Sequence, residues 1–165
     1  MLFNSFEFIF LFLPLTIIGY FLINRWNNRL AKLWLVSASL FFYSWWNIKY
    51  LPLILVSIGF NFTIGKTLSN DKLKFNRKTI LIIGLVGNIG LLGYYKYADF
   101  FINNVNSVLS TNLALLNIAL PLAISFFTFQ QIAYLVDTYR GEAKEYDLLN
   151  YALFVSFFPQ LIAGP

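Results

Sequence analysis

The chain has 165 residues, of which 59% are hydrophobic, 20% aromatic and 12% charged, and its net charge is +5. So many apolar residues exceed what one small soluble core can bury, which excludes an ordinary water-soluble domain. The sequence contains no cysteine and no histidine, which excludes disulfides and thiolate metal sites within it. In a membrane protein the basic excess is explained by Lys and Arg in cytoplasmic loops, so no nucleic-acid partner is expected.

The first apolar segment is expected to be retained as a membrane span. Residues 1–24 contain no basic residue and no small-residue cleavage site, and they carry Glu7, which differs from a secretory signal peptide. Further segments of similar length follow, each near the ~20 residues that cross a bilayer. The chain is therefore predicted to be an all-α polytopic membrane protein, part of a larger helical bundle. Its six predicted spans are residues 6–23, 30–46, 51–68, 80–95, 113–136 and 148–163.

The distribution of basic residues predicts the orientation of this bundle. The connections after the first, third and fifth spans carry ten of the twelve Lys and Arg residues, and the other two connections carry two. Because cytoplasmic loops are enriched in Lys and Arg, these three connections should face the cytoplasm and Met1 the outside. Tyr94, Tyr95 and Tyr97 then cluster at the outer headgroups, where aromatic rings anchor helix ends.

Residues 98–112, between the fourth and fifth spans, mix apolar and polar side chains. They combine Asp99 and several Asn residues with Phe, Ile, Val and Leu. We expect an amphipathic helix that lies in the outer membrane interface. The alternative is an ordinary polar loop with buried aromatic side chains.

Glycine recurs at every third position of the fourth span, at residues 84, 87, 90 and 93. At 3.6 residues per turn these glycines wind slowly round one side of a helix and leave a shallow groove. Small residues let a second helix approach closely, so helix packing is the expected role. Contact with an acyl chain or a cofactor tail is the less favoured alternative.

The fifth span carries a polar stripe near its middle. On a helix with 100° per residue, Asn117, Pro121, Ser125, Thr128 and Gln131 fall on one face. Polar groups in hydrocarbon need partners, so the stripe should face other helices or a water-filled cavity. Interhelical hydrogen bonding is the conservative interpretation, and a substrate cavity is the alternative.

Asp137 and Arg140 stand three positions apart at the predicted cytoplasmic end of the same span. A helical ion pair or an interfacial anchor is the default interpretation. A nucleophile and base formed by Ser125 and Lys96 is not expected, because Ser125 is placed at mid-membrane and Lys96 near an outer helix end.

Two C-terminal blocks carry a resemblance to a known family. PLAISFFTFQQIAYLVDTYRG at residues 121–141 and NYALFVSFFPQLIAGP at residues 150–165 resemble the membrane-bound O-acyltransferase family, in its alginate O-acetyltransferase branch. The opening FNSFEFIFLFLPL, the hairpin FFYSWWNIKYLPLIL and the stretch GYYKYADF resemble the same branch. The resemblance therefore covers essentially the whole chain.

The resemblance implies transfer of an acyl group, usually acetyl, to hydroxyls of an extracytoplasmic polysaccharide such as alginate or peptidoglycan. The implied donor is intracellular acetyl-CoA or another acyl thioester, with no cofactor held by the chain. The implied location is the cytoplasmic membrane, and the implied partner is a separate esterase-like extracytoplasmic acetylation protein.

The family pattern also implies a catalytic His in a later membrane segment. Because acyl transfer needs a base or an activated nucleophile and no His is present, we expect residues 1–165 to be an N-terminal portion that is inactive alone. It supplies no catalytic residue and no metal ligand. The candidate residues are Ser125, Gln131, Tyr134 and Gln160 for a substrate cavity, and Asp137 and Arg140 for its cytoplasmic mouth.

Two alternatives to an O-acyltransferase stay open. One is a six-span transporter or channel subunit, and the other is a noncatalytic membrane partner of a polysaccharide export system. A transporter predicts paired charges at mid-depth in the membrane, whereas the charges here lie almost entirely in loops.

Overall fold

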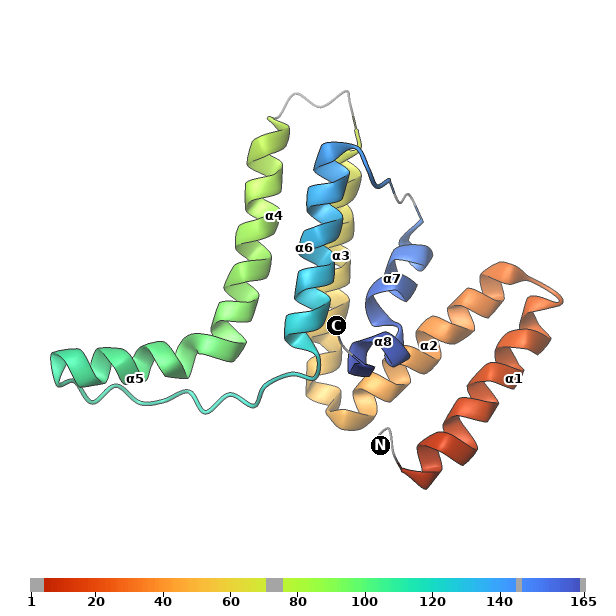
Figure 1. Cartoon of the computed structure of the whole chain (residues 1–165), viewed down its shortest axis with the longest axis horizontal. Coiled ribbons are helices and arrows are strands. Elements are labelled where there is room, and N and C mark those ends of the chain that lie inside the picture. The colour runs from red at the N-terminus through yellow and green to blue at the C-terminus, as the bar shows by residue number, and fades with distance from the viewer. Residues whose placement is uncertain (1–4, 71–75, 145–146, 164–165) are drawn as a thin grey trace.

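The protein is built from helices that run back and forth between two ends (Figure 1). The computed structural model describes residues 5–70, 76–144 and 147–163, and these contain no strand, which confirms the all-α class. Helices α3, α4 and α6 contact one another, α7 packs on α2 and α3, and α1 packs on α2. Their bounds are α1 Leu13–Asn24, α2 Asn28–Trp46, α3 Leu51–Leu68, α4 Arg77–Leu92, α5 Ala98–Leu109, α6 Ile124–Arg140, α7 Leu148–Ser156 and α8 Phe158–Ala163. Short π-helical turns, Glu7–Phe12 and Gly93–Tyr97, precede α1 and α5.

Short polar side chains start several of these helices. The side chain of Asn27 accepts hydrogen bonds from the backbone N–H groups of Arg29 and Leu30 before α2. Asn76 and Asp147 accept similar bonds, each of 3.0 Å, before α4 and α7. Because the first N–H groups of a helix have no partner within it, these caps define where the helices begin.

Long apolar helices make this a multi-pass membrane protein. Three stretches are long and apolar enough to cross a bilayer: Glu7–Asn24, Ile48–Leu68 and Arg77–Leu109. A shorter apolar stretch covers Leu148–Leu161. Most of their apolar surface is not covered by protein, as expected where lipid is the solvent. The count of six spans and the outward N-terminus stay predictions.

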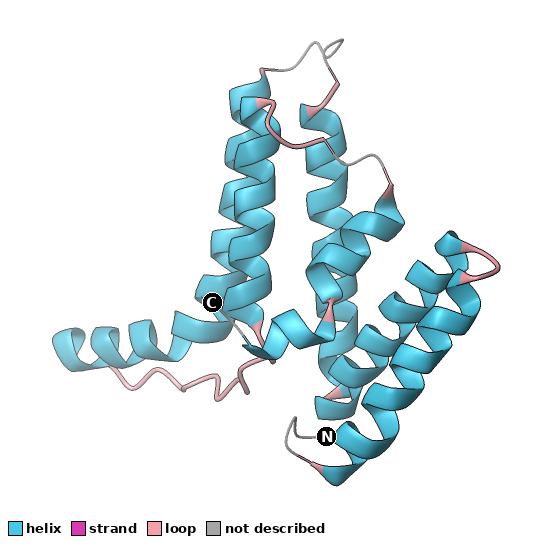
Figure 2. Ribbon diagram, turned by 45° about the vertical axis from the view of Figure 1, so that its right-hand side comes forward, coloured by secondary structure: helices cyan, strands magenta, loops and turns pink. Residues whose placement is uncertain are grey.

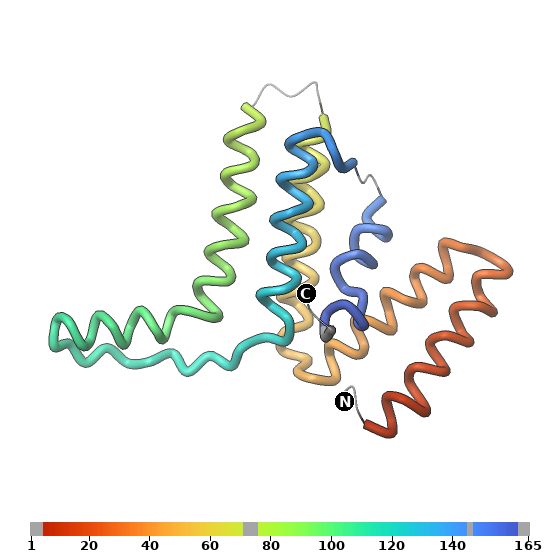
Figure 3. Tube along the Cα trace, viewed as in Figure 1, coloured from red at the N-terminus to blue at the C-terminus, as the bar shows by residue number. Residues whose placement is uncertain are grey.

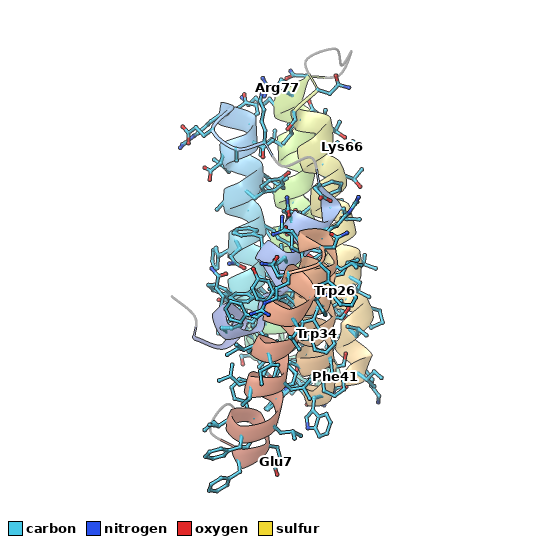
Figure 4. All side chains as sticks on the ribbon, turned by 90° about the vertical axis from the view of Figure 1, so that its right-hand side faces the viewer. Glu7, Trp26, Trp34, Phe41, Lys66 and Arg77 are labelled. Atoms are coloured by element: carbon cyan, nitrogen blue, oxygen red, sulfur yellow. The ribbon has the colours of Figure 1, made fainter. Side chains whose placement is uncertain are left out.

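Charges separate toward the two ends of the bundle. Lys66 and Arg77 lie at the top of Figure 4, and Glu7 lies at the bottom. In Figure 1 the C-terminal ends of α3 and α6 and the start of α4 share the top, whereas α5 lies at the bottom. Trp26, in the basic connection between α1 and α2, lies between these two ends in Figure 4, so the orientation of the bundle stays a prediction.

The predicted fifth span is wrong over nearly half of its length, residues 113–123. Residues 113–123 are not helical, and α6 begins only at Ile124. Asn117 and Ala123 have φ angles of 48° and 55°, in the left-handed region that ends helices. Pro121 has no N–H and disfavours helical backbone at the residue before it. Asn117 and Pro121 therefore do not belong to a helical polar stripe.

The predicted last span, residues 148–163, is two helices, α7 and α8, and not one continuous helix. The chain leaves helical geometry at Phe157, with φ −55° and ψ 107°, and α8 starts anew at Phe158. Pro159 explains the break, because inside a continuous helix its ring would collide with the carbonyl group one turn earlier. The N–H of Phe158 donates instead to Ser39 Oγ at 3.3 Å, which ties α8 to α2.

Residues 98–112 were expected to form a helix, and α5 confirms it over Ala98–Leu109. Figure 2 shows α5 projecting from the foot of the bundle. Figure 3 shows the chain after α5 running back toward α6 as an extended trace. The location of α5 in a membrane interface stays a prediction.

The glycines of α4 divide into two pairs. A Cβ at Gly84 would lie 2.6 Å from Leu135 Cδ1 of α6, and one at Gly87 would lie 2.8 Å from the Phe60 ring of α3. These two glycines therefore have the helix-packing role that was predicted. A Cβ at Gly90 or Gly93 would meet no atom of the described residues within 4 Å.

Candidate functional site

A buried cluster of amide and hydroxyl side chains joins α3, α4 and α6. Asn61 and Asn88 exchange two side-chain hydrogen bonds, of 3.1 and 2.6 Å. Gln131 Oε1 accepts from Ser57 Oγ at 2.7 Å and also from the side chain of Asn61. Asn88 further donates to the carbonyl group of Gly84 at 2.7 Å. In an apolar bundle these bonds hold three helices in one register.

The cluster is almost fully buried, and Ser57, Asn61 and Asn88 line a small cavity of about 190 Å³ between α3 and α4. Gln131 and Thr128 are both 0% exposed, and Asn61 is 1% exposed. Within the described residues, Gln131 Nε2 and Thr128 Oγ1 have no hydrogen-bond partner. Gln131 lines neither this small cavity nor the larger one described below, and its printed hydrogen bonds join α6 to α3, so the conservative interpretation of the polar stripe fits Gln131.

A cavity of about 590 Å³ lies between α6 on one side and α7 and α8 on the other. The aromatic side chains of Phe126, Tyr134, Tyr151 and Phe154 form much of its wall. Asp137 of α6 and Lys144 of the following loop line the same cavity. Both follow Tyr134 toward the C-terminal end of α6, at the top of Figure 1, which is the end rich in basic residues. The cavity thus joins an aromatic part to a charged part, which suits a ligand with an apolar and a polar portion.

Polar side chains from three helices complete the lining. They are Gln130 of α6, Asn150 of α7 and Gln160 of α8. Lys32 of α2 donates to Asn150 Oδ1 at 2.7 Å. This bond fixes which way the amide of Asn150 is oriented in the cavity wall. Helix α2 therefore sets the hydrogen-bonding character of one cavity wall.

Close packing positions the aromatic wall. The rings of Tyr134 and Tyr151 lie 4.6 Å apart, and Phe62 of α3 packs on Tyr151 at 5.7 Å. On the opposite side of Tyr134, a Cβ at Gly65 would overlap its ring. Only glycine lets α3 and α6 approach closely enough to hold Tyr134 in this place.

The sequence-predicted site residues divide between this cavity and other places. Tyr134, Gln160 and Asp137 line the cavity, and the structure brings them together from α6 and α8. Gln131 belongs to the buried cluster. Arg140 is exposed and does not line the cavity, and no ion pair joins it to Asp137. Of the two default interpretations, the ion pair is therefore wrong, and the interfacial anchor stays a prediction.

Ser125 has a neighbour that the sequence argument excluded. Lys96 Nζ donates to Ser125 Oγ at 3.3 Å, so the two residues are within hydrogen-bonding distance. The expectation failed because it placed Ser125 in the middle of a long span, whereas α6 starts one residue before it. Both residues thus lie at the end of the bundle opposite the cavity mouth, and the contact involves an exposed lysine.

Eight lining residues were not among the predicted candidates, and four of them carry polar side-chain groups: Gln130, Lys144, Asn150 and Tyr151. The neighbouring glutamines at positions 130 and 131 could have indicated Gln130. Side chains of adjacent helical residues point about 100° apart, so only one of the two amides can join the buried cluster. Asn150 and Tyr151 open the second of the two C-terminal blocks, residues 150–165, but nothing in their spacing relates them to α6. That relation comes from tertiary packing.

Comparisons with known proteins identify relatives along the whole chain. The chain is 45% identical to a peptidoglycan O-acetyltransferase of Helicobacter pylori, in an alignment that covers 100% of this chain and 36% of the relative. It is 37% identical to proteins named probable alginate O-acetylase from Pseudomonas aeruginosa and Azotobacter vinelandii, covering 100% of this chain and 32% and 34% of theirs. The chain thus spans about a third of the length of these relatives. No family model and no solved structure matches it.

These relatives agree with the family indicated by the two C-terminal blocks and the opening segment. Identities of 34–45% over every residue of this chain, in a helical membrane protein, are those of homologous proteins. The chain is therefore homologous over its whole length to these proteins, which are members of the membrane-bound O-acyltransferase family that the sequence resembles.

Proposed function

We propose that this chain is the N-terminal portion of a membrane O-acetyltransferase that modifies hydroxyl groups of a cell-envelope polysaccharide. The observation that carries the proposal is the similarity of all 165 residues to a peptidoglycan O-acetyltransferase and to alginate O-acetylases. We propose acetyl-CoA or another acyl thioester as the donor. In this scheme the cytoplasmic membrane holds the enzyme between an internal donor and an external polymer.

The reaction sets limits on what these residues do. A polymer hydroxyl oxygen attacks the thioester carbonyl carbon, the C–S bond breaks, the thiolate leaves, and the hydroxyl proton passes to a base. Histidine is the usual base for this step, and these 165 residues contain none. We therefore assign them the membrane scaffold and part of the donor pathway, with the base supplied from outside them.

The cavity between α6 and α7 supports the donor side of this scheme. Lys144 carries positive charge that favours an anionic donor, and Arg140 adds to the positive potential at the same end. Gln160 offers an amide group for hydrogen bonds, and the aromatic wall suits the small apolar acyl group. The Asp137 carboxylate is negative, so it disfavours the binding of a second anion beside the anionic donor.

Reconstitution tests the proposal directly. The full-length protein, in proteoliposomes, is supplied with acetyl-labelled CoA on the side of the basic loops and with de-O-acetylated alginate or peptidoglycan on the other. A separate esterase-like acetylation protein is added in one arm as the proposed partner. Label in alkali-labile esters of the polymer is expected. A protein that is correctly inserted but transfers no acetyl in either arm, with either polymer, would contradict the proposal.

A further inference from the structure

Helix α5 and the residues that follow it form a unit separate from the helix bundle. We define the return segment as residues 110–120, which run back from α5 toward α6 (Figure 3). None of the residues of α5 is buried. We infer that α5 and the return segment together form a platform seated in the headgroup region of the bilayer, with the apolar stripe of α5 in contact with lipid.

The length of the preceding helix places α5 at the membrane boundary. Arg77–Leu109 is a single apolar helical stretch of 33 residues, which would extend about 50 Å if it were straight. The hydrocarbon core is only about 30 Å thick, a distance that residues 77–97 already cover. The chain turns at that point, and α5 runs crosswise to α4 in Figure 1. The remaining residues therefore lie along the surface of the bilayer.

The turn is made of residues that favour the headgroup region. Its π-helical segment, Gly93–Tyr97, contains Tyr94, Tyr95, Tyr97 and Lys96. Tyr rings settle where one end of the ring meets water and the other meets hydrocarbon, and a Lys ammonium extends to the same level. Lys96 lies over the Tyr97 ring, with Nζ 5.4 Å from its centroid.

The two sides of α5 have different chemistry. At 100° per residue, Phe101, Ile102, Val105, Val108 and Leu109 fall within one apolar stripe. Val108 is 79% exposed and Phe101 is 63% exposed. An uncovered stripe of this kind on a helix with a polar opposite face is typical of helices that lie in a membrane surface.

The polar side of α5 is occupied by the return segment. Asp99 Oδ1 accepts from the Leu116 N–H at 2.7 Å, and Asn106 binds both the N–H and the C=O of Leu113 at 2.9 Å. Tyr50 donates its hydroxyl to the carbonyl of Ala119 and ties the segment to the bundle. Most of the extended backbone has no such partner and needs water, so the platform fits the interface and not the hydrocarbon core.

Continuity with α4 argues for lipid as the occupant of the stripe. The apolar side chains of Ile82, Ile83, Val86 and Ile89 are exposed along α4, which crosses the bilayer. Helix α5 follows α4 through the turn Gly93–Tyr97 within the same apolar stretch, Arg77–Leu109. The same solvent that covers α4 therefore covers α5, and at the turn that solvent is the boundary between acyl chains and headgroups.

Spin labels at single cysteines test this inference in the full-length protein. These 165 residues contain no cysteine, so only cysteines outside them need replacement. Val105→Cys and Val108→Cys place labels on the stripe, and Asn103→Cys and Ser107→Cys are controls on the other faces of the same helix. The protein is reconstituted in vesicles of phosphatidylcholine and phosphatidylglycerol. Collision rates are measured with oxygen, which dissolves in lipid, and with a water-soluble nickel chelate.

The two pairs of labels are expected to differ. The ratio of oxygen to nickel collisions should be several-fold higher at positions 105 and 108 than at positions 103 and 107. Low collision rates with both reagents at 105 and 108 would overturn the inference in favour of a covering protein segment. High nickel collision rates at those two positions would overturn it in favour of a water-exposed helix. The measurement does not depend on acetyl transfer, so its failure and the failure of the proposed function can be told apart.

Discussion

At the level of single residues, the two neighbouring glutamines of α6 have different roles, one in helix packing and one in the cavity wall. Gln131 is fully buried and accepts hydrogen bonds from α3, whereas Gln130 lines the cavity between α6 and α7. Amide side chains in lipid are retained where they find partners on other helices, and those partners decide whether a residue serves packing or binding.

Replacing Gln131 should therefore destabilise the fold. Gln131→Leu removes the acceptor for Ser57 and Asn61 and leaves two buried donors without it, which we expect to cost about 1–3 kcal/mol. Thermal unfolding of the full-length protein in detergent measures this loss. Gln160→Ala, in the cavity wall, is the matched comparison and should leave the melting temperature unchanged while lowering acetyl transfer. Equal melting temperatures for the two variants would show that Gln131 does not stabilise the packing of α3 against α6.

Two glycines of α3 provide a second matched pair. A Cβ at Gly65 would overlap the Tyr134 ring, whereas one at Gly59 would meet no atom of the described residues within 4 Å. Gly65→Ala should displace Tyr134 from the cavity wall, reduce acetyl transfer and lower the melting temperature. Gly59→Ala should be neutral or stabilising by up to about 1 kcal/mol, because alanine favours helix. Normal transfer by Gly65→Ala would show that the position of Tyr134 does not matter.

At the scale of elements, prolines and left-handed residues decide where the helices stop. Hydropathy alone runs through residues 113–123 and 148–163 without interruption, so it predicts two long spans there. Pro121 with Asn117, and Pro159 at the start of α8, interrupt both. The third and fourth spans were predicted well, because their ends coincide with the caps and turn residues Asn47, Asn76 and Gly93.

The cavity was only partly predictable for a related reason. Tyr134 and Asp137 share one helix, so their common placement follows from helical spacing. Gln160 joins them only because Pro159 breaks the last segment and α8 packs on α2. Lys144 and Asn150 come from a loop and from another helix. Periodicity within one segment carries no information on which segments pack together.

The hydrogen bonds that attach the return segment to α5 predict which backbone amides are protected from hydrogen exchange. Asn106→Ala removes both hydrogen bonds to Leu113, so amide exchange at Leu113 should accelerate while exchange at Leu116, held by Asp99, should change little. Asn104→Ala is the control, because Asn104 bonds only to a carbonyl group of its own helix. Hydrogen exchange read by mass spectrometry in lipid nanodiscs measures both sites. Unchanged exchange at Leu113 in Asn106→Ala would show that this side chain does not hold the segment.

At the scale of the whole molecule, the separation of charge predicts one membrane orientation. Asn28 and Glu142 belong to connections rich in basic residues, and Lys49 and Asn112 to the others. Cysteines at Asn28 and Glu142 should react with an impermeant maleimide only after cells are permeabilised. Cysteines at Lys49 and Asn112 should react in intact cells. Reaction of positions 28 and 142 from opposite sides would refute the arrangement.

The central claim is that the space between α6 and α7 serves acetyl transfer, and filling that space tests it most directly. Ala133→Trp places a large side chain in the cavity, and Phe129→Trp enlarges an exposed side chain of α6 outside it. Acetyl transfer to polysaccharide is measured in proteoliposomes for both full-length variants, at matched insertion and melting temperature. Ala133→Trp should lose acetyl transfer, and Phe129→Trp should retain it. Undiminished transfer by Ala133→Trp would show that the space between α6 and α7 is not used in the reaction.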